Sequence, residues 1–157
     1  MDFRRVAAAT LTIVVTLVIS PRLAGASEKT DVEAAVHRYF DNLGNDKLQT
    51  ALTMCDSHVS ILDEFPPHEW HGPTACVDWW KALGAYDEKE GITDGVAALG
   101  TAWTVDVTGD RAYLVAPATY DYKQHGKAVK ESSAVFTAAL RRTAEGWRIT
   151  AWTWSKH

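Results

Sequence analysis

The chain has 157 residues, of which 46% are hydrophobic and 23% are charged, and its 16 basic and 20 acidic side chains give a formal net charge of -4. This length suffices for a single domain with a real hydrophobic core. The acidic balance argues against nucleic acid or anionic lipid as a partner, because both need a basic footprint on the protein.

The N-terminus has the features of a secretory signal. The residues MDFRR precede an uncharged apolar run over 6–19, Pro21 then acts as a helix breaker, and Ala-Gly-Ala at 24–26 supplies a small-x-small cleavage pattern. The run is shorter than the roughly 18 residues expected of a transmembrane helix, which disfavours the alternative of an uncleaved anchor. We predict a signal peptide over 1–26, a mature domain over 27–157, export to the periplasm or beyond, and no stable membrane association after cleavage.

A capping box predicts the start of the first helix. Thr30 and Glu33 have the S/T-x-x-E spacing in which each side chain accepts from the other's backbone N–H, and Gly44 supplies a C-terminal stop. Apolar residues between these signals recur at helical spacing: Val32, Ala35, Val36, Tyr39, Phe40 and Leu43.

A short second helix from about Asp46 and then a strand over 58–65 are predicted next. The strand alternates, with Val59, Ile61 and Asp63 on one face. Prolines 66 and 67 end it, because proline cannot donate to a sheet ladder. Gly72-Pro73 opens a third helix whose apolar stripe comprises Cys76, Val77, Trp80, Leu83 and Gly84.

The rest of the chain reads as strands. We predict them over 102–107, 112–122, 128–140 and 147–154, with glycine-containing turns at 109–110, 125–126 and 145–146. Pro117 indicates a bulge or an edge position in the second of these strands. The order of elements predicts an α+β domain with three N-terminal helices packed on one face of an antiparallel sheet.

The two cysteines leave two possibilities open. In an oxidising compartment Cys55 and Cys76 can pair, and the closed loop would contribute roughly 3 kcal/mol in the chain-entropy model. The alternative is a pair of small buried thiols.

Aromatic side chains recur on common strand faces and predict a pocket wall. Because every second residue of a strand shares a face, Trp152 lies with Trp154, and Tyr120 lies with Tyr122. The residues predicted to bind a small apolar ligand are Phe65, Trp80, Tyr120, Tyr122, Phe136, Trp152 and Trp154. The alternative is that these aromatics form the core or a dimer face.

From the capped first helix to the final WRITAWTWS strand, the chain resembles the nuclear transport factor 2-like superfamily, in particular its SnoaL-like and ketosteroid isomerase-like members. The resemblance implies a cone-shaped fold in which a strongly curved sheet wraps around the helices and leaves a deep pocket. It also implies a possible homodimer. It does not fix a function, because this fold hosts many enzymes and many non-catalytic binding modules.

The resemblance assigns roles to two residues. In VHRYFDNLGND, Tyr39 stands where steroid isomerases carry the tyrosine that hydrogen-bonds the substrate oxygen, and in SILDEFPP, Asp63 stands where they carry the proton-shuttling aspartate. The acid that completes their oxyanion hole should lie near Ala134, where this chain has none. Ser132 or Ser133 can substitute for it if the register shifts.

These residues predict proton transfer, without a cofactor, on a small apolar carbonyl or hydroxyl compound. Desolvation would raise the pKa of Asp63 into the range of a general base, and Tyr39 would stabilise the developing oxyanion. If the chain is an enzyme, it is an isomerase or a lyase. The alternative for Asp63 is a solvated carboxylate at a strand end, and the alternative for Tyr39 is a residue of the helix core. The alternative for the whole chain is a non-catalytic module that binds a ligand or a protein.

The stretch DEFPPHEWHG also raises a metal hypothesis. His68 and His71 have H-E-x-H spacing, one residue short of the H-E-x-x-H pattern that places both histidines on one helical face. We therefore predict no metal and expect histidines on the surface of a proline-stiffened pocket rim. A proton relay through a histidine is the remaining alternative, and Phe65 with Trp70 would form apolar lips at the pocket entrance.

Overall fold

The computed structural model describes residues 21–45 and 47–156. The predicted signal peptide therefore lies mostly outside the described residues. Within the described ranges, no helix is both long enough and apolar enough to cross a membrane. The elements are, in chain order, α1 (Pro21–Gly44), α2 (Leu48–Leu52), β1 (Cys55–Leu62), β2 (Glu69–Gly72), α3 (Ala75–Glu90), β3 (Ile92–Leu99), β4 (Thr104–Thr108), β5 (Arg111–Gln124), β6 (Lys127–Thr143) and β7 (Gly146–Ser155).

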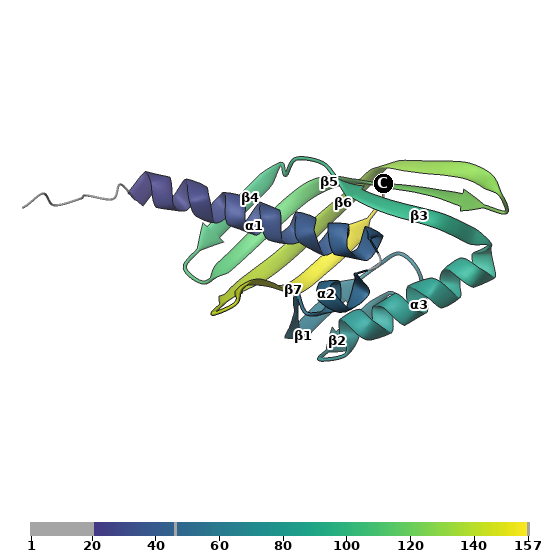
Figure 1. Ribbon diagram of the computed structural model, residues 1–157, viewed down its shortest axis with the longest axis horizontal. Coiled ribbons are helices and arrows are strands. Elements are labelled where there is room, and N and C mark those ends of the chain that lie inside the picture. Colours follow the sequence, from purple (N-terminus) through teal and green to yellow (C-terminus); the bar gives the residue numbers. More distant parts are fainter. Residues whose placement is uncertain (1–20, 46, 157) are drawn as a thin grey trace, which may run out of the picture.

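Helix α1 begins earlier than the capping box predicts. The Thr30 hydroxyl lies inside the helix and donates to the carbonyl of Ala26 at 3.1 Å, while Glu33 accepts from the backbone N–H of Ala102 at 3.0 Å. The predicted cap at Thr30 is therefore wrong. Pro21 takes the first described position of α1, which proline fits, and the predicted break between it and the preceding apolar run lies outside the described residues. The first turns of α1 project past the sheet (Figure 1). The predicted stripe is confirmed by the buried side chains of Val32, Ala35, Val36 and Tyr39.

The curved sheet has the order β2-β1-β7-β6-β5-β3, and β4 pairs with β5 beyond the end of β3. The helices pack against this sheet (Figure 1), which confirms the α+β class. The prediction of a purely antiparallel sheet is wrong at one position, because β1 pairs parallel with β7. Such a pair needs a long crossover, and here the chain between the two strands includes α3 and five other strands.

Two strands lie where the sequence predicted none. Strand β2 pairs antiparallel with β1 directly after the two prolines, with Leu62 opposite Glu69. Its four residues, EWHG, are too few to show an alternating pattern. Strand β3 is interrupted by a register shift between Thr93 and Val96, and Asp94 has a positive φ of 56°. These irregularities explain why periodicity did not reveal β3.

Pro117 lies inside the long strand β5, at a place where the neighbouring strand is interrupted. On one side Pro117 stands opposite Val135 of β6. On the other side its carbonyl accepts from the N–H of Gly100, in the loop that separates β3 from β4. Because the proline nitrogen faces this loop, its missing N–H removes no ladder bond. The predicted bulge lies close by, as a register shift between Ala118 and Tyr120.

A bulge in β1 determines which of its side chains point inward. Asp56, Val59 and Ile61 are all buried, although the first two are an odd number of positions apart. The register with β7 shifts between Cys55 and Ser60, which changes the parity there. The predicted inward face of Val59 and Ile61 is confirmed, and the following Asp63 continues that parity.

Asp56 is the one charged residue among the buried residues of the described chain. Arg141 donates from Nε and Nη2 to Asp56 Oδ2 at 3.1 and 2.5 Å, and the His58 backbone N–H donates to Oδ1 at 3.2 Å. The Arg141 hydrogen bonds hold the pKa of Asp56 below its ordinary value, against the opposing effect of burial. This pair ties β1 to β6, although β7 lies between them.

A disulfide joins β1 to α3. Cys55 and Cys76 are bonded, with Cα atoms 6.7 Å apart, so the pairing that the sequence left open is present. The bond holds the first turn of α3 against the start of β1. α3 then runs to Gly91, whose φ of 66° provides a left-handed C-cap.

The Asp56–Arg141 pair predicts a pH-dependent loss of stability. Arg141→Gln leaves a buried carboxylate without its cation, and breaking a fully buried pair costs about 3–5 kcal/mol. Because the Arg141 side chain is 39% exposed, we expect a smaller loss of about 2 kcal/mol in the free energy of unfolding at pH 7, measured by urea denaturation. A lowered pKa in the folded state makes this contribution complete above about pH 4, and it is lost as the pH falls through the folded pKa.

Arg111→Gln is the matched control, because Arg111 pairs with Asp110 at 3.6 Å and both side chains are exposed. It should cost less than about 0.5 kcal/mol. Equal losses in the two variants, or a loss for Arg141→Gln that persists unchanged at pH 3, would contradict the assigned role of the buried pair.

Candidate ligand-binding and catalytic site

A cavity of about 270 Å³ lies between the helices and the sheet. Its lining comes from α1, the β1–β2 connection, α3, and strands β3, β5, β6 and β7. Every residue predicted for the site lines this one cavity: Tyr39, Asp63, Phe65, Trp80, Tyr120, Tyr122, Phe136, Trp152 and Trp154. The sequence did not predict several other lining residues: Phe40, Glu64, Trp79, Leu83, Tyr86, Asp87, Glu131 and Lys156.

Asp63 enters the cavity directly after the end of β1. Its backbone N–H donates to the carbonyl of His68 at 3.0 Å and closes the turn that leads to β2. Its carboxylate accepts two hydrogen bonds, from the Trp79 indole to Oδ2 at 2.8 Å and from the Glu64 backbone N–H to Oδ1 at 2.7 Å. The side chain is thus held in one orientation, and each oxygen keeps a lone pair free.

Burial raises the pKa of Asp63 from its ordinary 3.8 to about 6. The hydrogen bonds from Trp79 and Glu64 favour the charged form and partly oppose this rise, while the nearby Glu64 charge adds to it. A carboxyl group with this pKa is mostly ionised at neutral pH and still accepts a proton more readily than a solvated aspartate.

Tyr39 reaches the cavity from α1. Its side chain is 1% exposed, and its hydroxyl has no hydrogen-bond partner among residues 21–45 and 47–156. Burial raises the pKa of Tyr39 far above its ordinary value. A weak hydrogen-bonding interaction from the Trp152 indole N–H opposes this rise, and the Asp63 charge increases it. Tyr39 therefore remains a neutral donor at any physiological pH.

Trp152 lies beside these groups on β7. It is 4% exposed, and its Nε1 has no partner in the part of the chain that the structure describes. Its ring meets the Trp79 ring edge-on, with centroids 4.8 Å apart, and tilts against Phe136 at 5.7 Å. The buried Ala134 supplies no acid at this place, and neither Ser132 nor Ser133 is among the lining residues.

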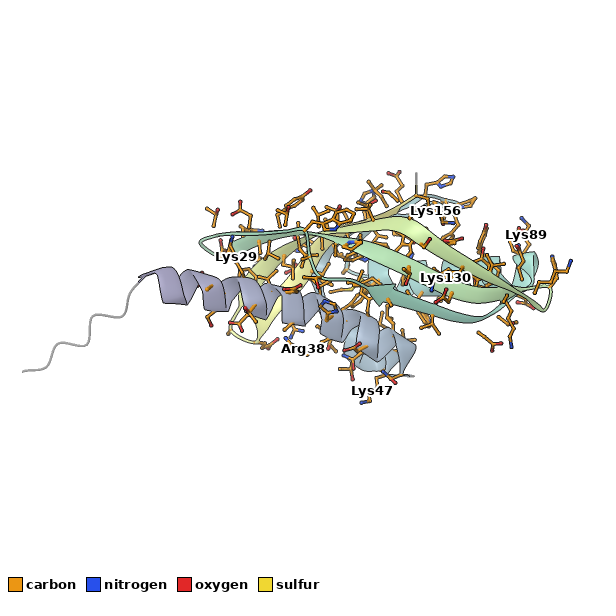
Figure 2. The ribbon with its side chains drawn as sticks, turned by 90° about the horizontal axis from the view of Figure 1, so that it is seen from above. Lys29, Arg38, Lys47, Lys89, Lys130 and Lys156 are labelled. Carbon is orange, nitrogen blue, oxygen red and sulfur yellow. A yellow bond between two sulfur atoms is a disulfide. The ribbon has the colours of Figure 1, made fainter. Side chains whose placement is uncertain are left out.

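A second part of the cavity lining is acidic. The rings of Tyr120 and Tyr122 stack with centroids 4.9 Å apart, and Tyr122 donates to Glu131 Oε1 at 3.1 Å. Lys156 donates to the same oxygen at 2.7 Å and also pairs with Glu64. In Figure 2, Lys156 stands over the sheet, well apart from the cations along α1.

A second carboxyl group in this part of the lining, that of Asp87, also has its pKa raised by burial. Tyr120 lies over Gly95, where a Cβ atom would come within 2.1 Å of the tyrosine hydroxyl. Any larger residue at position 95 would therefore displace this wall.

The rim differs from the predicted arrangement of apolar lips. Phe65 is buried and stacks on Tyr86 with centroids 5.2 Å apart, and Trp70 packs against Phe65 but does not line the cavity. His68 and His71 are exposed, and His71 lies 3.1 Å from Ser60 Oγ and 3.3 Å from Glu69 Oε2. The described residues contain no group of three His, Cys, Asp or Glu side chains that could hold a metal ion.

Trp79 is the functional residue that the sequence analysis missed most clearly. The predicted α3 stripe ran through Val77 and Trp80, whereas the buried residues of the helix are Ala75, Cys76 and Trp79. A signal was present, because Cys76, Trp79, Leu83 and Tyr86 also follow helical spacing. Because Asp63 was already predicted to point into the pocket, the stripe that contains Trp79 should have been preferred, since it brings an indole N–H donor to that carboxylate.

The comparisons with known proteins agree with this architecture. The family model of the SnoaL-like domain matches residues 32–156. A search of curated proteins found no match. A nuclear transport factor 2-like protein with a cystatin-like fold from Novosphingobium aromaticivorans superposes with a TM-score of 0.70 at 16% identity, over 88% of this chain and 87% of that one.

Two further solved structures are similar. One is a ketosteroid isomerase-like protein from Erwinia carotovora atroseptica, with a TM-score of 0.62 and 15% identity over 82% of this chain and 95% of that one. The other is described as a candidate dehydratase of the same family from Streptomyces avermitilis, with a TM-score of 0.68 and 17% identity over 88% and 99%. These identities establish a shared fold and nothing further about activity. The solved structures show that the chain has the nuclear transport factor 2-like fold, and the family match shows that it belongs to the SnoaL-like domain family.

Proposed function

We propose that this protein binds a small apolar molecule bearing a carbonyl or hydroxyl oxygen and catalyses proton transfer on it, as an isomerase or a lyase without a cofactor. The observation that carries the proposal is the Asp63 carboxylate, held in an apolar cavity by two hydrogen bonds with its pKa raised to about 6. The buried, unpartnered hydroxyl of Tyr39 lines the same cavity in the described chain. A base and a neutral donor are the groups that enolisation requires.

The proposed step begins with a ketone whose α-hydrogen faces Asp63. The carboxylate takes this proton, and the electron pair of the C–H bond forms a carbon–carbon double bond. The π pair of the carbonyl moves to oxygen, which accepts a hydrogen bond from Tyr39. If the ketone has a β,γ double bond, the oxygen's electron pair re-forms the carbonyl, the double bond moves to the α,β position, and the γ-carbon takes the proton back from Asp63, which completes an isomerisation. If the ketone carries a β-hydroxyl instead, re-formation of the carbonyl creates the α,β double bond and expels the hydroxyl, which leaves as water with the proton from Asp63 and completes a dehydration.

The charges around the cavity favour a neutral ligand over an anion. Glu64, Asp87 and Glu131 join Asp63 in the lining, and the lining cation Lys156 already pairs with Glu64 and Glu131. An added carboxylate or phosphate would therefore meet mostly like charges in a medium of low dielectric. The aromatic walls suit an apolar or aromatic skeleton.

A second candidate function is binding without catalysis. The unpartnered hydroxyl of Tyr39 can hold a ligand oxygen whether or not Asp63 removes a proton. The two functions differ in the effect of Asp63→Asn, which keeps the shape of the side chain but removes the base.

Hydrogen exchange tests the proposed chemistry directly. In heavy water the mature protein should catalyse deuterium incorporation at the α-positions of 1-indanone, 2-tetralone or 2-cyclohexenone, followed by NMR or mass spectrometry. Asp63→Asn should lower the rate by about 10² to 10⁴, the usual contribution of a general base. The wild-type rate should fall as the pH drops through about 6, because Asp63 becomes protonated.

The matched control is Asp106→Asn, which changes an exposed aspartate of β4 and should leave the exchange rate unchanged. Binding of these ketones to the folded protein with no exchange would leave only the binding function. Exchange that is equally fast in Asp63→Asn would show that Asp63 is not the base.

The raised pKa of Asp63 also predicts a change in stability that needs no substrate. Because the folded-state pKa lies above the unfolded value, the free energy of unfolding should decrease as the pH rises from about 4 to 6, relative to Asp63→Asn. At 1.36 kcal/mol per pKa unit, this relative change is on the order of 2 kcal/mol. Urea denaturation of both proteins at pH 4 and pH 8 measures it, and a constant difference between them would argue against a desolvated Asp63.

We also infer that the protein acts outside the cytoplasm. The Cys55–Cys76 disulfide supports this location, since such bonds persist mainly in oxidising compartments. The predicted signal peptide points the same way. N-terminal mass spectrometry of the protein recovered from intact cells and their medium should find a chain starting at Ser27 in the exported fraction. Recovery of the full chain only from the cytoplasm would contradict the inference.

A further inference from the structure

The Trp152 indole N–H is a buried donor without a hydrogen bond of normal geometry in the described part of the chain. Its Nε1 is inaccessible to solvent and has no hydrogen-bond partner among the described residues. A buried polar group left in this state costs about 1–3 kcal/mol, and such groups in folded proteins usually have a functional reason. The neighbouring wall is apolar, formed by the rings of Phe136 and Trp79.

Trp152 places this N–H donor in the cavity that holds the two residues of the proposed reaction, Tyr39 and Asp63. Trp152 and Tyr39 line the same cavity, and the indole N–H lies against the tyrosine hydroxyl in a weak hydrogen-bonding interaction that lowers the pKa of Tyr39, although neither atom has a hydrogen bond of normal geometry in the described chain. The Trp152 ring also contacts Trp79, whose own indole N–H holds Asp63. Two donors without a hydrogen bond of normal geometry thus adjoin each other in the cavity that also holds the anchored base.

We propose that Trp152 Nε1–H and the Tyr39 hydroxyl donate together to one ligand oxygen, so that Trp152 is the second donor of the oxyanion site. The inference rests on the proposed function and extends it. A carbonyl oxygen has two lone pairs and accepts two hydrogen bonds, so a single oxygen satisfies both orphaned donors. The β6 position where the resemblance places an acid is the buried Ala134, and the donor comes from β7 instead.

This arrangement narrows the ligand class. Two neutral donors that converge on one point favour an sp² oxygen, as in a ketone, an enone or a lactone, over an ammonium group, which can only donate. The oxygen gains negative charge when Asp63 removes the α-proton, and both hydrogen bonds then strengthen. Trp152 would therefore act mainly on the transition state.

NMR of the indole N–H groups tests the direct contact. The chain has seven tryptophans, and ¹⁵N-indole labelling of the wild type with comparison to Trp152→Phe identifies the Trp152 signal. Methyl benzoate and N,N-dimethylbenzamide are suitable probes, because neither has an acidic α-hydrogen and the amide oxygen is the stronger acceptor. Both should move the Trp152 proton downfield, the amide further than the ester. The exposed Trp103, which is 63% accessible, should stay unchanged.

The results separate two kinds of failure. If the probes move the signal of Trp80, which lines the cavity, but leave that of Trp152 unchanged, the second-donor inference is overturned and the pocket remains. An equal Trp152 shift for the ester and the amide would likewise overturn a direct hydrogen bond. If saturating probe moves no indole signal from the cavity, both the inference and the proposed ligand class fall.

A shape-preserving substitution tests the catalytic effect. Replacing Trp152 by 3-benzothienylalanine keeps the bicyclic ring and exchanges the N–H for sulfur, which avoids the cavity that Trp152→Phe creates. With a ketone that the wild type exchanges, kcat should fall by about 10² to 10³ while KM changes little, as for loss of one oxyanion donor. An unchanged kcat, with normal folding by circular dichroism, would exclude Trp152 from the reaction.

Discussion

The hydrogen bond from the Trp79 indole to Asp63 Oδ2 is the contact on which the candidate site depends. It joins α3 to the end of β1, and it holds a carboxylate that burial alone would leave poorly oriented. Two features upstream make it possible. The bulge in β1 sets the parity that turns Asp63 inward, and the Cys55–Cys76 bond fixes the turn of α3 from which Trp79 extends. The bulge, the disulfide and the Trp79 hydrogen bond thus all contribute to the position of Asp63.

The sequence was sufficient to predict the parts of the fold that follow a regular period. The buried stripe of α1 and the cavity aromatics repeat every two, three or four residues, so they could be predicted without long-range information. The start of α1 was mispredicted because Thr30 and Glu33 satisfy a local rule that tertiary contacts override. Glu33 binds the loop at Ala102, which no local window contains.

Other features depended on contacts between distant segments. The parallel pairing of β1 with β7 joins segments at opposite ends of the domain, and the burial of Asp56 becomes intelligible only with Arg141 beside it. The unpartnered state of Trp152 is likewise a property of the assembled cavity. The homodimer implied by the family resemblance stays a prediction, since the single chain does not test it. Periodicity predicted many of the side chains that line the cavity. Their hydrogen-bond partners and the directions of their pKa shifts could be seen only in the folded structure.

The disulfide has a further consequence for how this site can change. Residues 56–75, which include Asp63, the two prolines and the histidines of the rim, form the interior of a covalently closed ring. The rim between β1 and β2 lies inside this ring, so replacing its exposed residues costs little additional chain entropy while the buried side chains of the two strands stay in place. The rim residues of this ring can therefore be exchanged to admit other ligands. The bond at Cys76 meanwhile keeps α3, and with it Trp79, in position.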